Sequence, residues 1–340
     1  MQKDYATPSW LTKDNGKPFL VALLPCGLRN AFQQALVAAF SEYDNLECSE
    51  MVIEGNLNYE KSLYDSIDQT DSLDYFPDIL ISSDINSLYH KRFTEKYLNN
   101  KWFEETTHRP VHPIFQDAGY IHPDGIMNWF TANLLVMVAD TDRFEHRSLP
   151  TSWYDILDKR YDKDLTLRGD TDFFCNAMLF PYIKTKGDDA IKDLGRNTLK
   201  GLHPSQMVKL MHTGNYGGSS VYVMPYSFAI KIKNRERYKI IFPNEGAIVS
   251  PVQMLIKKGS YEKHRRVVDF ILGETMASVL NQVGFPSSNP NAENDLPDTR
   301  LNWIGWDFIQ NHDISECKRQ MQSLFFATYS PDSSFSITTL

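Results

Sequence analysis

The hydrophobic and polar positions of the first hundred residues switch repeatedly between two periods. Residues 19–24 form an uninterrupted apolar run, which predicts a strand buried on both faces. Pro25 and Gly27 interrupt the run, and apolar residues then recur at helical spacing over residues 32–40. We therefore expect a strand, a short loop and a helix, in this order.

The same order recurs in the next segment. Residues 46–55 predict a strand, residues 58–68 a helix, and residues 76–84 a strand that ends at a polar Ser-Ser-Asp sequence before another helix. Strands that alternate with helices favour parallel β-α-β units, in which ligands bind beyond the carboxyl ends of the strands. The loops at residues 25–30 and 82–86 are therefore expected at a binding edge.

Similar patterns continue to the end of the chain. Residues 108–125 contain three prolines and three histidines without periodicity, so we expect an irregular connector there. Strands are predicted over residues 129–140, 163–169 and 219–225 and on both sides of residues 243–246. Helices are predicted over residues 170–183, 187–198, 204–215 and 306–326, and a helix pair over residues 260–288.

The segment LPTSWYDILDKRYDKDLTL, residues 149–167, predicts a capped helix followed by a strand. Ser152 and Asp155 have the spacing of a capping box, and Trp153 is expected in the buried stripe of the helix. The strand after it leads to Arg168, Gly169 and Asp170. We expect this segment to position neighbouring residues and to carry no chemistry itself.

Length and charge narrow the class of protein. A chain of 340 residues fits two units of about 100 to 200 residues each. Its net charge of −8 argues against a nucleic-acid partner, since that affinity rests on Lys and Arg that neutralise phosphates. The sequence contains no run of 18 apolar residues, so no transmembrane segment is predicted. The four cysteines are widely spaced and are expected as thiols, not disulfides.

The order of these elements, with three motifs, resembles a known family. The segment at residues 149–167 is similar to the P-x-S-W-x-D-L-L-D-x-x-Y-K-G-K-I segment of type II periplasmic-binding-protein-like solute-binding proteins of ABC transporters. KGDDAIKDLGRN resembles the G-x-x-A-x-x-x-L-x-x-N helix of the ferric-iron and polyamine branch, and IIFPNEGAIVSPVQMLIKKG resembles its P-x-E-G-x-x-x-x-P-x-x-x-x-I-x-K-G block. The resemblance covers about residues 18–330.

The resemblance implies an α/β fold with two lobes, each a mixed sheet flanked by helices, and two hinge crossings. The crossings are expected near residues 130–140 and 226–242. The first lobe would comprise residues 17–122 and 236–328, the inserted second lobe residues 123–235, and the tails residues 1–16 and 329–340. A small ligand would be held in the cleft between the lobes, and the chain would be a binding protein and not an enzyme.

Candidate ligand-binding residues follow from the predicted strand ends and the connector. The turn between the first strand and helix, residues 25–30, presents backbone N–H groups and the guanidinium of Arg29, which suit an anionic ligand. The other candidates supply hydroxyl, carboxylate and phenol groups. The candidates are Cys26, Gly27, Leu28, Arg29, Ser82, Ser83, Asp84, Tyr120, His122, Asp170, Thr171, Asp172, Tyr226, Ser227 and Glu245.

The ligand itself stays open between a metal ion such as iron, a small anion and a polyamine. Tyr226 and His122 are weak candidates for metal ligands. The iron branch typically has two adjacent tyrosines, whereas here Tyr222 and Tyr226 are separated, with Met-Pro between them. The histidines of the connector match no standard zinc spacing. No resident cofactor is predicted.

The resemblance implies a partner and a cellular compartment for this chain, and the N-terminal residues bear on the compartment. The family implies an ABC permease partner, an extracytoplasmic location and a monomer. The first residues show no apolar export signal, so a cytoplasmic ligand sensor on the same fold is the alternative, and an enzyme on this scaffold is a third reading.

Overall fold

The computed structural model describes residues 18–40, 51–55, 67, 76–100, 102–104, 110–170 and 173–330. The helix expected over residues 58–68 falls almost wholly outside the described residues, and so do His108, Thr171 and Asp172. The other predicted elements can be compared with the structure.

The chain forms two compact units, and two strands contribute residues to both. Unit 1 comprises Met1–Asn133, Ser250–Leu296 and Gly305–Ser315, and unit 2 comprises Leu134–Val249, Pro297–Ile304 and Glu316–Leu340. These units divide inside β4 (Asn128–Asp140) and inside β9 (Ala247–Ile256). Residues 226–242 lie within unit 2, where Tyr226 begins a helix, and the lobe boundaries after residues 122 and 235 and the two hinge crossings stay predictions.

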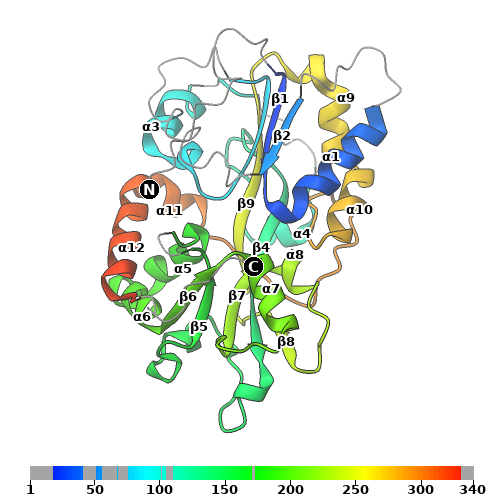
Figure 1. Ribbon diagram of the computed structural model, residues 1–340. Helices are drawn as coiled ribbons and strands as arrows, with labels where there is room; N and C mark the ends of the chain where they lie inside the picture. The colour runs from blue at the N-terminus through cyan, green and yellow to red at the C-terminus, as the bar shows by residue number, and fades with distance from the viewer. Residues whose placement is uncertain are drawn as a thin grey trace. The chain divides into compact units, whose positions relative to one another are not determined.

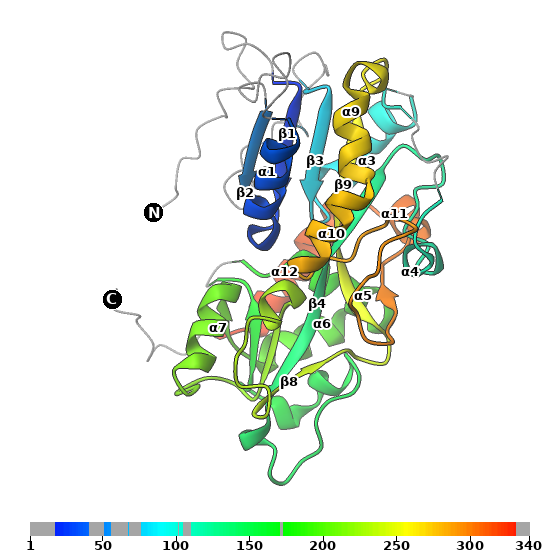
Figure 2. The ribbon, with the colours of Figure 1, turned by 90° about the vertical axis from the view of Figure 1, so that its right-hand side faces the viewer.

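Unit 1 is built on the predicted β-α-β pattern. Strands β2, β1 and β3 are parallel neighbours, and β9 lies antiparallel to β3 with Ile81 opposite Met254. Helices α1, α9 and α10 bury their apolar faces against this sheet (Figures 1 and 2). The elements are β1 (Leu20–Leu24), α1 (Cys26–Phe40), β2 (Met51–Gly55), β3 (Ile79–Ser83), α3 (Lys91–Phe93), α4 (Pro113–Asp117), α9 (Tyr261–Leu272), α10 (Glu274–Gln282) and α11 (Trp306–Asn311).

The apolar periods explain the packing of α1. Leu28, Phe32, Leu36 and Phe40 recur every fourth residue, and all four are buried in the core of unit 1. The fully apolar strand β1 lies between β2 and β3, and all five of its residues are buried, so both its faces are covered. The sequence-based prediction of this strand and helix is confirmed.

Unit 2 contains a second set of parallel strands. Strands β6, β5 and β7 are parallel neighbours, and β4 pairs antiparallel with β7 and with β8. The elements are β5 (Leu165–Arg168), α5 (Asn176–Lys186), α6 (Asp188–Asn197), β6 (Thr198–Leu202), α7 (Pro204–His212), β7 (Val221–Pro225), α8 (Tyr226–Ala229), β8 (Tyr238–Ile241), β10 (Leu301–Asn302) and α12 (Ile314–Thr328) (Figure 1). The last predicted helix is thus two helices, α11 and α12.

Strand β6 was not expected from the sequence. Its residues TLKGL show neither an apolar run nor a clear alternation, and only Thr198 is fully buried. The strand forms because it pairs with β5, where Leu167 faces Gly201. A Cβ atom at Gly201 would lie 2.4 Å from the carbonyl oxygen of Asp170, so glycine is required by this close approach.

The segment at residues 149–167 positions its neighbours, but its predicted helix is two 3₁₀ turns, Asp155–Leu157 and Lys159–Tyr161. The Asp155 carboxylate accepts the N–H of Ser152 at 3.0 Å, as the capping pattern predicted. The Trp153 indole donates to the Gly246 carbonyl oxygen at 2.7 Å, and the Trp153 carbonyl accepts the Tyr182 hydroxyl at 2.9 Å. These bonds tie the segment to the core of unit 2.

Among the described helices, none is long and apolar enough to cross a membrane. The cysteines of the described part, Cys26, Cys175 and Cys317, are free thiols, and Cys48 lies outside it.

Candidate functional site

In unit 2, three parallel strands end at the same edge of the sheet. Strand β5 ends at Arg168, β6 at Leu202 and β7 at Pro225, so the next residues along each strand lie at this edge. Loops beyond the carboxyl ends of parallel strands are the usual ligand sites of such sheets. We call the group Arg168, His203, Tyr226 and Ser227 the unit 2 edge.

Arg168 is the cation of the unit 2 edge. It is half-buried, and its Nη1 donates to Sγ of Cys175 at 3.2 Å. Cys175 is buried at the N-terminal end of α5, so this contact places the guanidinium beside the start of that helix. A guanidinium in this position has donors in a planar fork that fits carboxylate or phosphate oxygens.

His203 directly follows β6 and begins α7. Its Nδ1 accepts the N–H of Ser205 at 3.3 Å, and Gln206 closes a capping box on the N–H of His203. Burial lowers the pKa of His203, and the charge of Arg168 lowers it further. With Nδ1 acting as an acceptor, the neutral ring carries its proton on Nε2, which is a hydrogen-bond donor.

Tyr226 and Ser227 begin α8 directly after β7. The Tyr226 ring is half-buried and meets the Phe242 ring edge-on, with 5.2 Å between the ring centroids. Ser227 is 1% exposed, and its Oγ has no hydrogen-bond partner within the described part of the chain. Phe228, the next residue of α8, packs edge-on against the His203 ring at 6.0 Å, which connects this strand end to that of β6.

The unit 2 edge therefore collects hydrogen-bond donors. It combines a guanidinium, a neutral imidazole N–H, a phenol and a buried hydroxyl whose bonding capacity is unused. A buried polar group without a partner costs free energy, and such a group in a native fold calls for an explanation. The arrangement can bind an anion or a neutral polar ligand rich in oxygen.

The expected acidic residues of this edge are only partly described. Asp170 follows β5 and is exposed, and its N–H donates to the Phe173 carbonyl oxygen at 2.7 Å. Thr171 and Asp172 lie outside the described residues.

In unit 1, the candidates at the start of α1 have different roles. Leu28 is buried in the core, and its N–H donates to the Pro25 carbonyl oxygen at 2.8 Å, so we leave it out of the proposed site. Cys26 is exposed, and Gly27 and Arg29 are half-buried. Arg29 Nε donates to the side chain of Asn30 at 3.3 Å. Arg29 is thus the residue of this turn whose charge reaches solvent.

Ser82 and Ser83 are the last residues of β3, and with Asp84, at the start of the following loop, they are buried and hydrogen-bonded. Ser83 donates its hydroxyl to the Leu23 carbonyl oxygen at 3.2 Å, and Ser82 Oγ accepts amide hydrogens from Asn86 at 2.7 Å and Gln253 at 3.0 Å. Asp84 has a φ of 72°, and its Oδ1 accepts the N–H of Ile85 at 2.8 Å. The loop lies at the predicted strand edge, and both serine hydroxyls already have protein partners.

The two connector candidates are built into the packing of unit 1. Tyr120 is fully buried, donates to the Thr131 carbonyl oxygen at 3.2 Å and accepts the N–H of Val252 at 3.3 Å. Burial raises the pKa of Tyr120 well above its usual range. His122 is buried, accepts the N–H of Asp124 at 3.0 Å and lies edge-on to Trp306, so burial lowers its pKa, with a small opposing effect of Asp124.

Glu245 holds a turn of unit 2. One carboxylate oxygen accepts the hydroxyl of Ser152 at 2.6 Å, and the other accepts the N–H of Trp153 at 3.0 Å. Both oxygens therefore serve the Ser152–Trp153 turn, and we leave Glu245 out of the proposed site.

The described residues contain no group of three or more His, Cys, Asp or Glu side chains placed to hold a metal ion. His203, a member of the unit 2 edge, and Cys175, the partner of Arg168, were not identified from the sequence. The signal for His203 was hidden because β6 was not recognised as a strand, although His-Pro before a helix pattern marks a helix start.

The fold is shared with solved solute-binding proteins. The apo ferric ion-binding protein A of Pasteurella haemolytica has a TM-score of 0.65 at 12% identity, covering 93% of this chain and 98% of that chain. FutA (IdiA) of Trichodesmium, in complex with iron and citrate, has a TM-score of 0.62 at 11% identity, covering 91% and 98%. AfuA of Actinobacillus pleuropneumoniae, with bound fructose 6-phosphate, has a TM-score of 0.60 at 14% identity, covering 89% and 96%. The predicted periplasmic-binding-protein-like α/β fold is confirmed.

The sequence itself also matches a family. Residues 74–312 match the model of the bacterial extracellular solute-binding proteins, whereas no curated protein matches the chain. The match spans more than half of the 340 residues, so the chain belongs to this family. It is a solute-binding protein, and its family is one of binding proteins, not enzymes.

Proposed function

We propose that this solute-binding protein binds a small anionic solute and that the unit 2 edge holds the anionic group. The observation that carries the proposal is the set of donors at three adjacent strand ends. Arg168 ends the middle strand β5, His203 follows β6 on one side, and the buried, unpartnered hydroxyl of Ser227 lies in α8, directly after β7 on the other side. Charge-assisted hydrogen bonds from a guanidinium are among the stronger polar interactions in proteins.

Two structural neighbours with bound ligands support an anionic solute. FutA of Trichodesmium is described with iron and citrate, and AfuA is described with fructose 6-phosphate. Citrate and a sugar phosphate share negatively charged oxygens, which suit the donors of the unit 2 edge. A polyamine would instead need carboxylates at the site.

A thermal-shift screen tests the class of solute. The ligands are inorganic phosphate, citrate, fructose 6-phosphate, ferric citrate and spermidine, each added to the full chain. At least one anion is expected to raise the melting temperature, because a ligand that binds only the folded state stabilises it in proportion to ln(1 + [L]/Kd). Stabilisation by spermidine alone, or by none of the five, would contradict the proposal.

Variants of the unit 2 edge then test the residues. Arg168→Gln is expected to weaken binding of the stabilising anion by about tenfold or more, since a hydrogen bond to a charged group contributes about 1.5 to 3 kcal/mol. Ser227→Ala should weaken binding while leaving the unliganded protein at least as stable, because the hydroxyl has no partner in the described structure. Lys192→Gln, at an exposed cation of α6, is the control and should bind as the unchanged protein does.

A ferric ion is the second candidate solute, favoured by the half-buried phenol of Tyr226 at the strand end. If Tyr226 ligates ferric iron, the loaded protein shows a visible tyrosinate-to-iron absorption band that Tyr226→Phe removes. Absence of the band in the unchanged protein loaded with ferric citrate would exclude Tyr226 as a ligand, while retained binding of the citrate anion would still support the anion proposal.

We further propose that the chain acts outside the cytoplasm as a monomer that delivers its solute to an ABC permease. The extracellular character of the family supports this location. Fractionation of the host and light scattering of the purified chain are the tests. Recovery of the full-length chain from the cytosol alone would favour the alternative role of a ligand sensor.

A further inference from the structure

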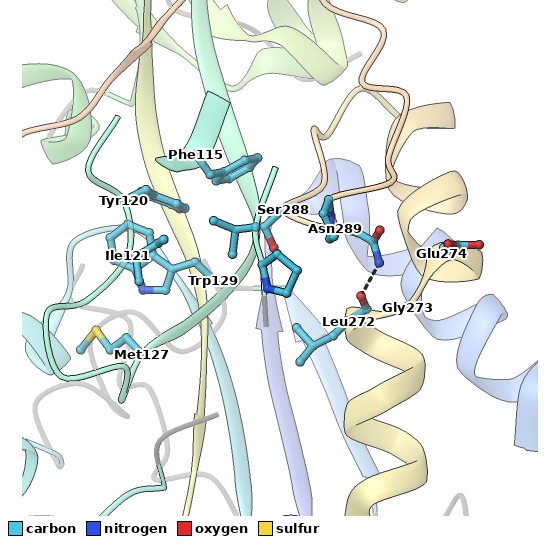
Figure 3. Close-up of a pocket in the computed structure, with 13 residues that line it drawn as sticks. Phe115, Tyr120, Ile121, Met127, Trp129, Leu272, Gly273, Glu274, Ser288 and Asn289 are labelled. Carbon is cyan, nitrogen blue, oxygen red and sulfur yellow. Dashed lines mark hydrogen bonds between the residues drawn. The ribbon is translucent and has the colours of Figure 1, made fainter. Parts of the chain in front are cut away.

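Unit 1 contains a pocket whose lining includes no residue of the unit 2 edge. It is lined by aromatic and aliphatic side chains, and its volume is about 290 Å³ (Figure 3). This is close to the lower end of about 300 to 1,000 Å³ that is usual for small-molecule sites. We call it the aromatic pocket and define it by Phe115, Tyr120, Ile121, Met127, Trp129 and Leu272.

The aromatic walls of the pocket are held in place by the surrounding fold. The Tyr120 hydroxyl donates to the Thr131 carbonyl oxygen and accepts the N–H of Val252, so its polar end is used by β4 and β9. The Tyr120 ring packs against Phe115, with centroids 5.2 Å apart, and edge-on against Trp129. The rings therefore offer a preformed apolar surface, which lowers the entropic cost of binding.

Two polar residues of the pocket lining make hydrogen bonds of their own. Asn289 donates its side-chain amide to the Leu272 carbonyl oxygen at 2.8 Å (Figure 3), and the Ser288 carbonyl oxygen accepts the N–H of His112 at 2.8 Å. Glu274 is the charged residue among the described lining residues, and its carboxylate accepts the amide of Asn291 at 2.8 Å and is directed away from the aromatic rings. A charged ligand would have to be desolvated here without a compensating partner, which is costly.

Ile121 marks the pocket as accessible. This side chain is 37% exposed, whereas Phe115, Tyr120, Met127 and Trp129 are buried. An aliphatic residue at the entrance and aromatic residues inside present apolar surface both to an entering molecule and to a bound one.

We propose that the aromatic pocket is a second binding site, for a small uncharged molecule with an aromatic body of one or two rings. The aromatic pocket differs in chemistry from the unit 2 edge, because the pocket offers apolar ring faces whereas the unit 2 edge offers hydrogen-bond donors. A ligand of this size in a preformed apolar pocket binds with a Kd on the order of 0.1 mM.

Calorimetric titration of the full chain with 1-naphthol tests the proposal, with 1-naphthoate as its charged counterpart. We expect 1-naphthol to bind with a negative heat-capacity change and 1-naphthoate to bind at least tenfold more weakly. No binding of 1-naphthol up to millimolar concentration, or equal binding of the two molecules, would overturn the assignment.

Two variants locate the bound 1-naphthol. Val111 also lines the pocket. Ile121→Asp puts a charge at the exposed Ile121 position, and Val111→Trp fills the pocket with a larger side chain, so each is expected to weaken 1-naphthol binding at least tenfold. Val37→Asp introduces the same charge at an exposed position of α1 and should leave binding unchanged. Melting temperatures of all three check that they fold; unchanged affinity in a folded Ile121→Asp or Val111→Trp protein would refute the location.

Discussion

Asp140 forms the main buried ion pair of unit 2, and its replacement by asparagine is a direct test of how that unit is stabilised. The Asp140 side chain is fully buried, and Arg237 donates to both of its oxygens at 2.7 and 2.8 Å. Asn215 donates to Oδ2 at 2.6 Å. Asp142 lies 3.0 Å from Nε of the same arginine, but its side chain is 61% exposed. Asp142→Asn is therefore a matched control.

The two substitutions should differ because of burial. Breaking a buried ion pair costs about 3 to 5 kcal/mol, since the remaining charge is left without its partner. Arg237 is 27% exposed and keeps some solvation, so we expect Asp140→Asn to lower the free energy of unfolding by about 2 to 4 kcal/mol. An asparagine also turns an amide donor toward donors of Arg237 or Asn215. Asp142→Asn should cost about 0 to 1 kcal/mol, as is usual for exposed pairs.

Urea unfolding of the two variants and the unchanged chain, followed by circular dichroism, measures the difference. The error of such comparisons is about 0.5 kcal/mol. If the free-energy losses of Asp140→Asn and Asp142→Asn differ by less than this error, the burial argument is refuted. A change in the urea slope would indicate that the units unfold separately, and the loss would then be taken from the transition of unit 2.

The pH dependence of this difference gives an independent check. Burial alone would raise the pKa of Asp140, but the hydrogen bonds from Arg237 and Asn215 and the charge of Arg237 hold it below its ordinary value. A carboxylate with a lowered pKa stabilises the fold fully above its unfolded pKa of about 3.9, and the stabilisation is lost as the pH falls through the folded pKa. The gap between the unchanged chain and Asp140→Asn should therefore be full near neutral pH and shrink in acid below about pH 4.

Three further predictions concern single contacts. Tyr120→Phe should lower the free energy of unfolding by about 1 to 3 kcal/mol in urea titrations, because Val252 N–H loses its acceptor; no loss would mean that water replaces the hydroxyl. Glu245→Gln should lower the melting temperature through the turn at Ser152 and Trp153 yet leave solute affinity unchanged, and a changed affinity would restore Glu245 to the binding site. Gly246→Ala should destabilise by more than about 2 kcal/mol, since φ is +92° and a Cβ would lie 2.3 Å from the Arg300 carbonyl oxygen. Gly259→Ala, with φ of +83° and no atom within 4 Å, is its control and should cost less in the same urea titration.

Much of the fold could be predicted because its elements have strong periods of their own. The apolar run of β1, the helical spacing of α1 and the amphipathic pair α9 and α10 identify strand and helix without reference to neighbours. The three motifs that resemble the solute-binding family lie in such regular segments and their turns. For this reason the sequence predicted the α/β class and the family, and both were confirmed.

The candidate site was predicted less completely. Ser227 and Tyr226 were identified because they follow an apolar strand, but His203 follows β6, which has no periodicity to reveal it. Leu28, Tyr120 and Glu245 have chemically suitable types or positions, yet the structure gives their groups to the core or to backbone partners. Residue type does not indicate whether a polar atom is already bonded.

The sequence by itself determined which segments are strands and helices wherever a period of two or 3.6 buries one face, and it determined the chemistry available along the chain. Only the tertiary structure decided which of those groups meet. Strand β6 exists through its pairing with β5, and this pairing brings His203 beside Arg168. The physical reason is that periodicity is a local property, whereas strand pairing, burial and the use of each hydrogen-bond donor depend on residues far apart in the chain.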